Sequence, residues 1–235
     1  MNVLLFDAKD ETAPGRVRVS GRRLRHVREI LRAGPGDELC VGRLGGRLGR
    51  GRIAALDADA LELEVTLDRD PPPPHPAALA LALPRPPSVR KVLSQASALG
   101  VKRVLFFASA RVEKSYWQSS ALRPEAVHEQ LSLGLEQAVD TVLPAVERER
   151  SFRKLVTETL PAFADGAEIL VAHPAHAPAP LAAGGRCVLV VGPEGGFLDE
   201  ELDALARAGA RPVGLGPRVL RVETAVVALL SRLAG

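Results

Sequence analysis

Two glycine-bearing segments late in the chain have the residue types and spacing of ligand-binding turns. The first is Gly192-Pro193-Glu194-Gly195-Gly196, and the second runs from Leu215-Gly216-Pro217 to Glu223-Thr224-Ala225. Each follows a short apolar run and leads into a predicted helix. Because glycine has no Cβ and tolerates positive φ, a ligand can approach the backbone closely there, and the first turn of a helix directs free N–H groups toward it. Side by side, the two turns would form one pocket with backbone walls.

The glycine spacing does not match the two common phosphate-binding loops. Phe197 follows Gly195-Gly196, where a Walker loop has Lys and then Ser or Thr. The position late in the chain and the spacing of the glycines also differ from the dinucleotide-binding fingerprint. A tight turn with a purely structural role is the alternative for each segment taken alone.

Metal, hydroxyl and thiol chemistry receive little support from the sequence. Among the histidines only His173 and His176 have a ligand-like spacing, and they lie among prolines and alanines, so no metal site is predicted. No nucleophile elbow indicates a serine hydrolase. Cys40 and Cys187 belong to no metal-spaced cluster or redox pair, and both are expected to be small buried residues.

The composition is that of an ordinary globular protein without a membrane span. Of the 235 residues, 46% are hydrophobic and 25% are charged, and no apolar run approaches the roughly 20 residues that cross a bilayer. The first residues lack the features of a secretory signal, which predicts a cytoplasmic protein. Arginines are concentrated between Arg16 and Arg52. They could attract a polyanion or could reflect a biased genome.

After a proline-rich segment at 71–76, apolar strands and amphipathic helices alternate along the chain. Strands are expected at 79–83, 104–108, 142–146, 168–172, 187–191 and 212–215, and helices at 88–99, 124–140, 151–163, 198–208 and 222–233. This alternation predicts an α/β fold with a mostly parallel sheet that helices cover on both faces. Ligands of such sheets bind beyond the carboxyl ends of the strands, and both glycine turns fall there.

The first third of the chain is expected to form a small β-barrel interrupted by one helix. Apolar runs at 3–6, 38–41, 52–56 and 61–67 predict its strands, and residues 61–67 alternate between apolar and polar. The helix is expected to start after Ser20 as N-cap and to end at Gly34. Its outer face, which could contact phosphates or could simply be solvated, carries Arg22, Arg25, Arg28 and Arg32.

Three segments together resemble the ribosomal RNA small subunit methyltransferase E family of the SPOUT superfamily: 26–36, 192–196 and 215–225. The resemblance runs the length of the chain. It implies a methyltransferase that uses S-adenosylmethionine to modify N3 of a uridine in 16S ribosomal RNA, free or in the small ribosomal subunit. It further implies a PUA-like RNA-binding barrel (1–70), a linker (71–76), a SPOUT domain with a C-terminal trefoil knot (77–235) and a homodimer.

The resemblance assigns roles to individual residues. Arg221 is the candidate cation beside the uridine, because a guanidinium does not readily lose its charge and stabilises an anion formed there. Glu223 could orient Arg221, accept the N3 proton or cap the last helix. The residues expected to bind the cofactor are His173, Gly192, Glu194, Gly195, Gly196, Leu215, Gly216, Leu220, Thr224 and Ala225.

The middle of the chain departs from the family pattern. Ala98 stands where the family has Glu, and Glu136-Gln137-Ala138-Val139-Asp140 stands where it has Glu-Gln-Ser-x-Arg. The loop 111–117 keeps Arg111 and Lys114, which are expected to contact RNA. It adds an adjacent Tyr and Trp that could stack on a base or pack under the loop. These changes leave two alternatives: a SPOUT methyltransferase for another RNA nucleotide, or a non-catalytic RNA-binding or ribosome assembly factor.

Overall fold

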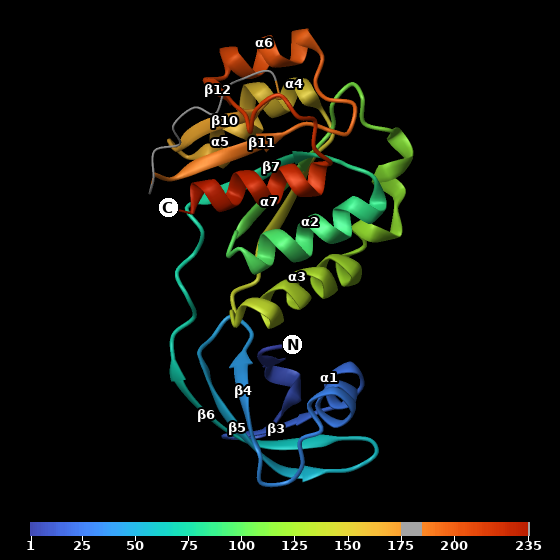
Figure 1. Ribbon diagram of the computed structural model, residues 1–235, viewed down its shortest axis with the longest axis vertical. Coiled ribbons are helices and arrows are strands. Elements are labelled where there is room, and N and C mark those ends of the chain that lie inside the picture. Colours follow the sequence, from blue (N-terminus) through green and yellow to red (C-terminus); the bar gives the residue numbers. More distant parts are fainter. Residues whose placement is uncertain (175–184, 235) are drawn as a thin grey trace. The chain divides into compact units, whose positions relative to one another are not determined.

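The computed structural model describes residues 1–174 and 185–234, so His176 lies outside the described residues. The chain divides into two compact units (Figure 1). The first comprises Met1–Pro73 and Ser132–Leu143, and the second comprises Pro74–Leu131 and Pro144–Gly235. The division falls inside the predicted linker 71–76. The inclusion of residues 132–143 in the first unit was not predicted.

The first unit contains a six-stranded sheet in the order β1-β4-β5-β6-β3-β2. Its strands are β1 (Leu4–Phe6), β2 (Glu11–Ala13), β3 (Arg16–Val19), β4 (Glu38–Arg43), β5 (Leu48–Leu56) and β6 (Leu61–Arg69). Only β1 and β4 pair in parallel among these strands. The predicted alternation in β6 is confirmed, since Leu61 and Leu63 are buried while Glu62 and Glu64 are exposed.

The hairpin of β2 and β3 was not predicted. Val17 and Val19 point into the core of the first unit, whereas Arg16 and Arg18 are exposed and face Glu64 and Glu62 across the strand pair. The stretch alternates with the period of a half-buried strand. Its arginines instead suggested a charged segment, so no strand was expected there.

The helix of the first unit is shorter and less regular than expected. It consists of α1 (Arg22–Arg25) and the π-helix η2 (His26–Leu31), preceded by the short η1 (Ala8–Asp10). Gly21, not Ser20, is the N-cap, and no side chain caps the helix. The helix ends at Arg32, which has a left-handed φ of 54°.

The second unit contains six parallel strands in the order β12-β10-β11-β7-β8-β9. They are β7 (Ala77–Ala82), β8 (Arg103–Phe107), β9 (Ala145–Glu149), β10 (Glu168–Ala172), β11 (Cys187–Val191) and β12 (Ala210–Val213). The predicted parallel α/β sheet is confirmed, although β9 lies three residues later than the predicted start at 142. Cys187 is buried as expected, and burial raises the pKa of its thiol to about 11, whereas Cys40 is only half-buried.

Helices cover both faces of this sheet. They include α2 (Pro86–Ala98), α4 (Phe152–Lys154), η5 (Leu155–Thr159), α5 (Leu160–Ala164), α6 (Asp199–Arg207) and α7 (Val222–Leu233). The remaining helical elements are the short turns η3 (Lys114–Gln118) and η4 (Ser120–Leu122) and the helix α3 (Pro124–Ala138), whose residues from Ser132 on belong to the first unit. Leu155, Phe163 and Leu205 pack in one apolar core with strand residues such as Val190. The helix α7 packs against β11 and α2, beside which it runs in Figure 1. No helix within the described ranges has the length and apolar composition to cross a membrane.

Candidate functional site

A cavity of about 370 Å³ lies at the carboxyl ends of β10, β11 and β12. These strands are neighbours and parallel, so the segments that follow them meet at one edge of the sheet. The volume is in the range of about 300–1,000 Å³ typical of small-molecule sites. Every predicted cofactor residue except Thr224 lines this cavity: His173, Gly192, Glu194, Gly195, Gly196, Leu215, Gly216, Leu220 and Ala225.

Bare backbone forms part of the cavity wall, as the sequence predicts. Gly216 has φ of +101°, and a Cβ built there would meet no atom within 4 Å. The backbone N–H groups of Leu215 and Gly216 donate to no residue in the described part of the chain. The second glycine segment therefore offers donors to a ligand without an intervening side chain.

The first glycine segment is built around Phe197. A Cβ at Gly192 would come within 3.1 Å of the Phe197 ring, which stacks on Phe107 with centroids 6.3 Å apart. Gly196 has φ of +72°, and its N–H donates to the Pro193 carbonyl at 2.8 Å. Glycine is needed here for packing and turn geometry as well as for ligand access.

Side chains from two other segments hold this turn. Glu194 accepts hydrogen bonds from the Arg85 backbone N at 3.0 Å and from its Nε at 3.3 Å, at the start of α2. Arg111, which was expected to contact RNA, lines the cavity and donates from Nη1 to the Gly195 carbonyl at 2.5 Å. Its part in the cavity wall was missed because the sequence places it 84 residues from Gly195.

The loop before α7 brings Arg221 to the edge of the site. Arg218, Val219 and Leu220 line the cavity, and Arg221 follows them as the exposed N-cap of α7. Within the described ranges, the guanidinium of Arg221 forms no hydrogen bond or ion pair. It is a cation available to a ligand.

Glu223 points away from the cavity and joins α7 to α2. Its carboxylate is buried and accepts hydrogen bonds from Ser88 Oγ at 3.1 Å and from Lys91 Nζ at 3.2 Å. Its own backbone N–H holds the pKa of Glu223 below its usual range; burial opposes this, and Lys91 and Ser88 support it. The arrangement favours the structural alternative for Glu223 over a proton acceptor. Thr224, beside it, is exposed and does not line the cavity.

The arginines of the first unit fall into two groups. Arg22 donates to both oxygens of buried Glu136 at 2.6 and 2.8 Å, and Arg23 does the same to Asp10. These contacts favour structural roles, contrary to the phosphate contact expected for Arg22. Arg25, Arg28 and Arg32 are exposed, and Arg28 forms an exposed pair with Glu29 at 3.3 Å.

The adjacent Tyr and Trp of the loop 111–117 lie in η3. Lys114 is exposed, whereas Tyr116 and Trp117 are half-buried. The Arg150 guanidinium lies over the Trp117 ring, 5.2 Å from its centroid. One face of this ring is therefore already occupied by the Arg150 guanidinium.

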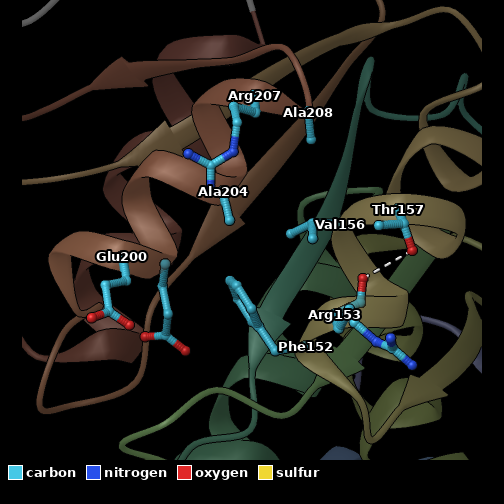
Figure 2. Close-up of a pocket in the computed structure, with 9 residues that line it drawn as sticks. Phe152, Arg153, Val156, Thr157, Glu200, Ala204, Arg207 and Ala208 are labelled. Carbon is cyan, nitrogen blue, oxygen red and sulfur yellow. Dashed lines mark hydrogen bonds between the residues drawn. The ribbon is translucent and has the colours of Figure 1, made fainter.

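A second hollow of about 500 Å³ lies between η5 and α6. Figure 2 shows Phe152, Val156 and Ala204 facing the gap, while the guanidinium groups of Arg153 and Arg207 point away from it. The Thr157 hydroxyl donates to the Arg153 carbonyl at 3.0 Å. None of the predicted site residues lining the glycine cavity lies here, since the described residues that line this hollow fall in 152–157 and 200–208. Among the described residues, His, Cys, Asp and Glu form no cluster that could hold a metal ion.

Known proteins resemble this chain in sequence and in fold. A family model described as RNA methyltransferase domain matches residues 71–234. The ribosomal RNA small subunit methyltransferase E of Treponema pallidum is 28% identical over 97% of this chain and 88% of that protein. The protein of the same name from Mycobacterium bovis is 41% identical over 37% of this chain and 35% of its own length.

A solved structure matches over the whole chain. It is a ribosomal RNA small subunit methyltransferase E from Neisseria gonorrhoeae bound to S-adenosyl methionine, with a TM-score of 0.76 and 22% identity. The match covers 98% of this chain and 95% of that one, which shows a common fold. The resemblance predicted from the motifs is thus confirmed. This chain belongs to the RNA methyltransferase domain family, and within it to the ribosomal RNA small subunit methyltransferase E family.

Proposed function

We propose that this chain is an S-adenosylmethionine-dependent methyltransferase that modifies N3 of a uridine in 16S ribosomal RNA. The main support for the proposal is the cavity, which is lined by nearly all predicted cofactor residues and whose wall is partly exposed backbone. The family supplies the reaction class, and a relative of the same fold was solved with S-adenosyl methionine bound.

The residues of the cavity fit this cofactor. S-adenosylmethionine, when bound, supplies a methyl group on a sulfonium, which the acceptor attacks in line. Binding and orientation then provide much of the rate acceleration. Gly192, Gly196, Leu215, Gly216 and Leu220 would hold the cofactor mainly through their backbone groups, with His173 at the rim.

Arg221 is the residue we assign to the acceptor base. Uridine N3 is a poor nucleophile until its proton leaves and negative charge spreads onto O2 and O4. A fixed cation favours that charged form, and a guanidinium keeps its charge at neutral pH. Arg221 follows the cavity-lining residues directly and is exposed, which supports the assignment.

The finer architecture is also a proposal. We assign residues 1–70 to a PUA-like RNA-binding barrel, 71–76 to a linker and 77–235 to a SPOUT domain with a C-terminal trefoil knot. The family supports the knot. The six-stranded sheet of the first unit is compatible with a barrel, and exposed Arg25, Arg28, Arg32 and Lys114 are the candidate RNA contacts.

We further propose a cytoplasmic homodimer whose substrate is 16S ribosomal RNA, free or in the small subunit. Val219 is 84% exposed and Leu220 is 39% exposed beside the cavity. A second subunit that covers them would remove apolar surface from water. Sedimentation at micromolar concentration should give twice the monomer mass of 24.9 kDa, and a monomer would contradict this part of the proposal.

Two measurements test the function. Calorimetric titration of the purified chain with S-adenosylmethionine should show one site per chain. Nucleoside mass spectrometry of 16S ribosomal RNA should show N3-methyluridine in cells with the chain and none in cells without it. Loss of a different methyl mark would favour another nucleotide target. An unchanged methylation pattern would favour a non-catalytic assembly factor.

A further inference from the structure

Arg111 covers the glycine turn 192–196 from the loop after β8. Its Nη1 donates to the Gly195 carbonyl at 2.5 Å. Its aliphatic stem packs against the turn, since a Cβ at Gly195 would lie 3.1 Å from Arg111 Cδ and 3.4 Å from its Cβ. The guanidinium is also 3.9 Å from a Cβ built at Gly196. Arg111 thus contacts Gly195 and lies beside Gly196.

Glu201 joins the same two segments a second time. Its buried carboxylate accepts a hydrogen bond from the Ala110 N–H at 2.8 Å through Oε1. The other oxygen, Oε2, accepts from the Leu198 N–H at 3.0 Å. Ala110 immediately precedes Arg111, and Leu198 follows the turn by two residues. The backbone that carries Arg111 is therefore fixed where its guanidinium reaches Gly195.

The last peptide of the turn lies between two glycines and is held by a hydrogen bond at each of its edges. Glycine on both sides of the Gly195–Gly196 peptide leaves many backbone conformations accessible. The Gly196 N–H donates to the Pro193 carbonyl at 2.8 Å, and because the peptide is planar and trans, the Gly195 carbonyl of the same peptide points the opposite way, where Arg111 Nη1 binds it. The turn and Arg111 therefore hold opposite edges of one peptide. A hydrogen bond from a charged donor is among the stronger ways to hold a carbonyl.

We propose that Arg111 is a positioning residue for the cofactor, which holds the Gly195 carbonyl and so keeps the turn 192–196 in the shape that bounds the cavity. The inference rests on the proposed function, because it takes S-adenosylmethionine as the ligand of this cavity. It differs from the RNA contact predicted from the sequence, since the guanidinium binds a backbone carbonyl of the protein itself.

The test is a titration of the full-length protein with S-adenosylmethionine for wild type and three variants. R111A removes the stem and the donor, R111M keeps the stem, and R111K keeps the stem and one donor. We expect about tenfold weaker binding for R111A and R111M, the size of one charge-assisted hydrogen bond. R111K should bind within about threefold of wild type. The matched control is R153A, an exposed arginine of the same unit whose guanidinium has no ion pair among the described residues.

A double-mutant cycle separates this contact from a general loss of stability. Gly195 is not among the glycines with positive φ, so G195A should fit the backbone and weaken binding mainly by displacing the Arg111 stem. The effects of G195A and R111A should therefore not add. Thermal unfolding midpoints should change little, because Arg111 is exposed.

The outcomes distinguish this inference from the proposed function. If wild type binds S-adenosylmethionine and R111A binds it equally well, the inference is wrong and the function stands. The inference is also wrong if R111A weakens only RNA binding and reduces its salt dependence, because Arg111 would then be a phosphate contact. Absence of cofactor binding by wild type would overturn the proposed function itself.

Discussion

Arg221 and Glu223 lie two residues apart at the start of α7 and have different surroundings. Arg221 is exposed beside the cavity-lining loop. Glu223 is buried and hydrogen-bonded to Ser88 and Lys91 of α2. Two charged residues in one motif can thus serve chemistry and structure separately, and their variants should differ in the property that they change.

Replacing Arg221 by alanine should affect methyl transfer and not cofactor binding. We expect kcat to fall about 100-fold or more, the usual cost of removing one group that stabilises a developing charge. The affinity for S-adenosylmethionine should stay within about threefold of wild type. Single-turnover methylation and calorimetry measure the two effects. R232A, an exposed arginine in the last turn of the same helix, is the control, and near wild-type transfer by R221A would contradict the role.

Replacing Glu223 by glutamine should lower stability in a pH-dependent way. The pKa of Glu223 is below its usual range in the folded state, so its charge stabilises the fold above the unfolded pKa, and the effect is lost as pH falls through the folded pKa. We expect E223Q to reduce the free energy of unfolding at pH 7 by about 1 kcal/mol. Urea titrations should show this gap closing below about pH 4.

The same variant tests the catalytic alternative. With a structural role for Glu223, E223Q should retain methyl transfer within a fewfold of wild type. A general base would instead lose about 10²–10⁴ in rate. A gap in stability that widens at low pH, or a rate loss of that size, would show that Glu223 does more than join α7 to α2.

Among the elements, the helix of α1 and η2 in the first unit carries arginines of two kinds, paired and exposed. Arg22 and Arg23 tie it to buried Glu136 and Asp10. Arg25 and Arg28 are on exposed positions. These arginines look alike in the sequence. Those that reach a buried acid form ion pairs, and the others are exposed.

Variants along this helix should separate stability from RNA binding. Arg22→Ala leaves the Glu136 carboxylate, 3% exposed, without its cation, and breaking a buried pair in this way costs about 3–5 kcal/mol. Because the Arg22 side chain is 42% exposed, we expect a loss near 2 kcal/mol. Arg25→Ala with Arg28→Ala should cost under about 0.5 kcal/mol but weaken RNA binding and flatten its salt dependence. Urea unfolding and binding at two salt concentrations measure both, and the reverse pattern would contradict the division.

Most elements of the second unit could be predicted because their apolar pattern is strong. The strands at 168–172 and 187–191 and the helix at 222–233 match the structure. The helix expected at 151–163 is interrupted by the π-helical turn η5, which hydrophobic spacing does not reveal. The hairpin of β2 and β3 was missed because half of the residues in β3 are arginines.

At the scale of the whole molecule, the site could be predicted to the level of its backbone. The parallel strand order brings the ends of β10, β11 and β12 together, and this follows from the alternation of strands and helices. The contacts of Arg111 with Gly195 and of Glu201 with Ala110 join residues 84 and 91 apart. No local pattern in one sequence reports such pairs.

The inclusion of residues 132–143 in the first unit also depends on contacts between residues that are far apart in the sequence. Asn2 and Val3 donate backbone hydrogen bonds to the Glu136 carbonyl at 2.8 and 3.2 Å, and Thr141 Oγ1 donates to the Gly46 carbonyl at 2.5 Å. Each of these contacts joins two residues that lie more than 90 positions apart in the sequence. Glu136, in the segment that departs from the family pattern, and Thr141, directly after that segment, therefore serve packing of the first unit.

The most direct test of the account is methyl transfer by the purified chain. The substrate is 16S ribosomal RNA from cells that lack this chain. It is presented free and in small subunits, with isotopically labelled S-adenosylmethionine as donor. We expect one labelled N3-methyluridine per RNA molecule for wild type, transfer slower by about 100-fold or more for R221A, and reduced transfer for R111A that saturating cofactor restores. A label on another atom or nucleotide, or no transfer despite bound cofactor, would contradict it.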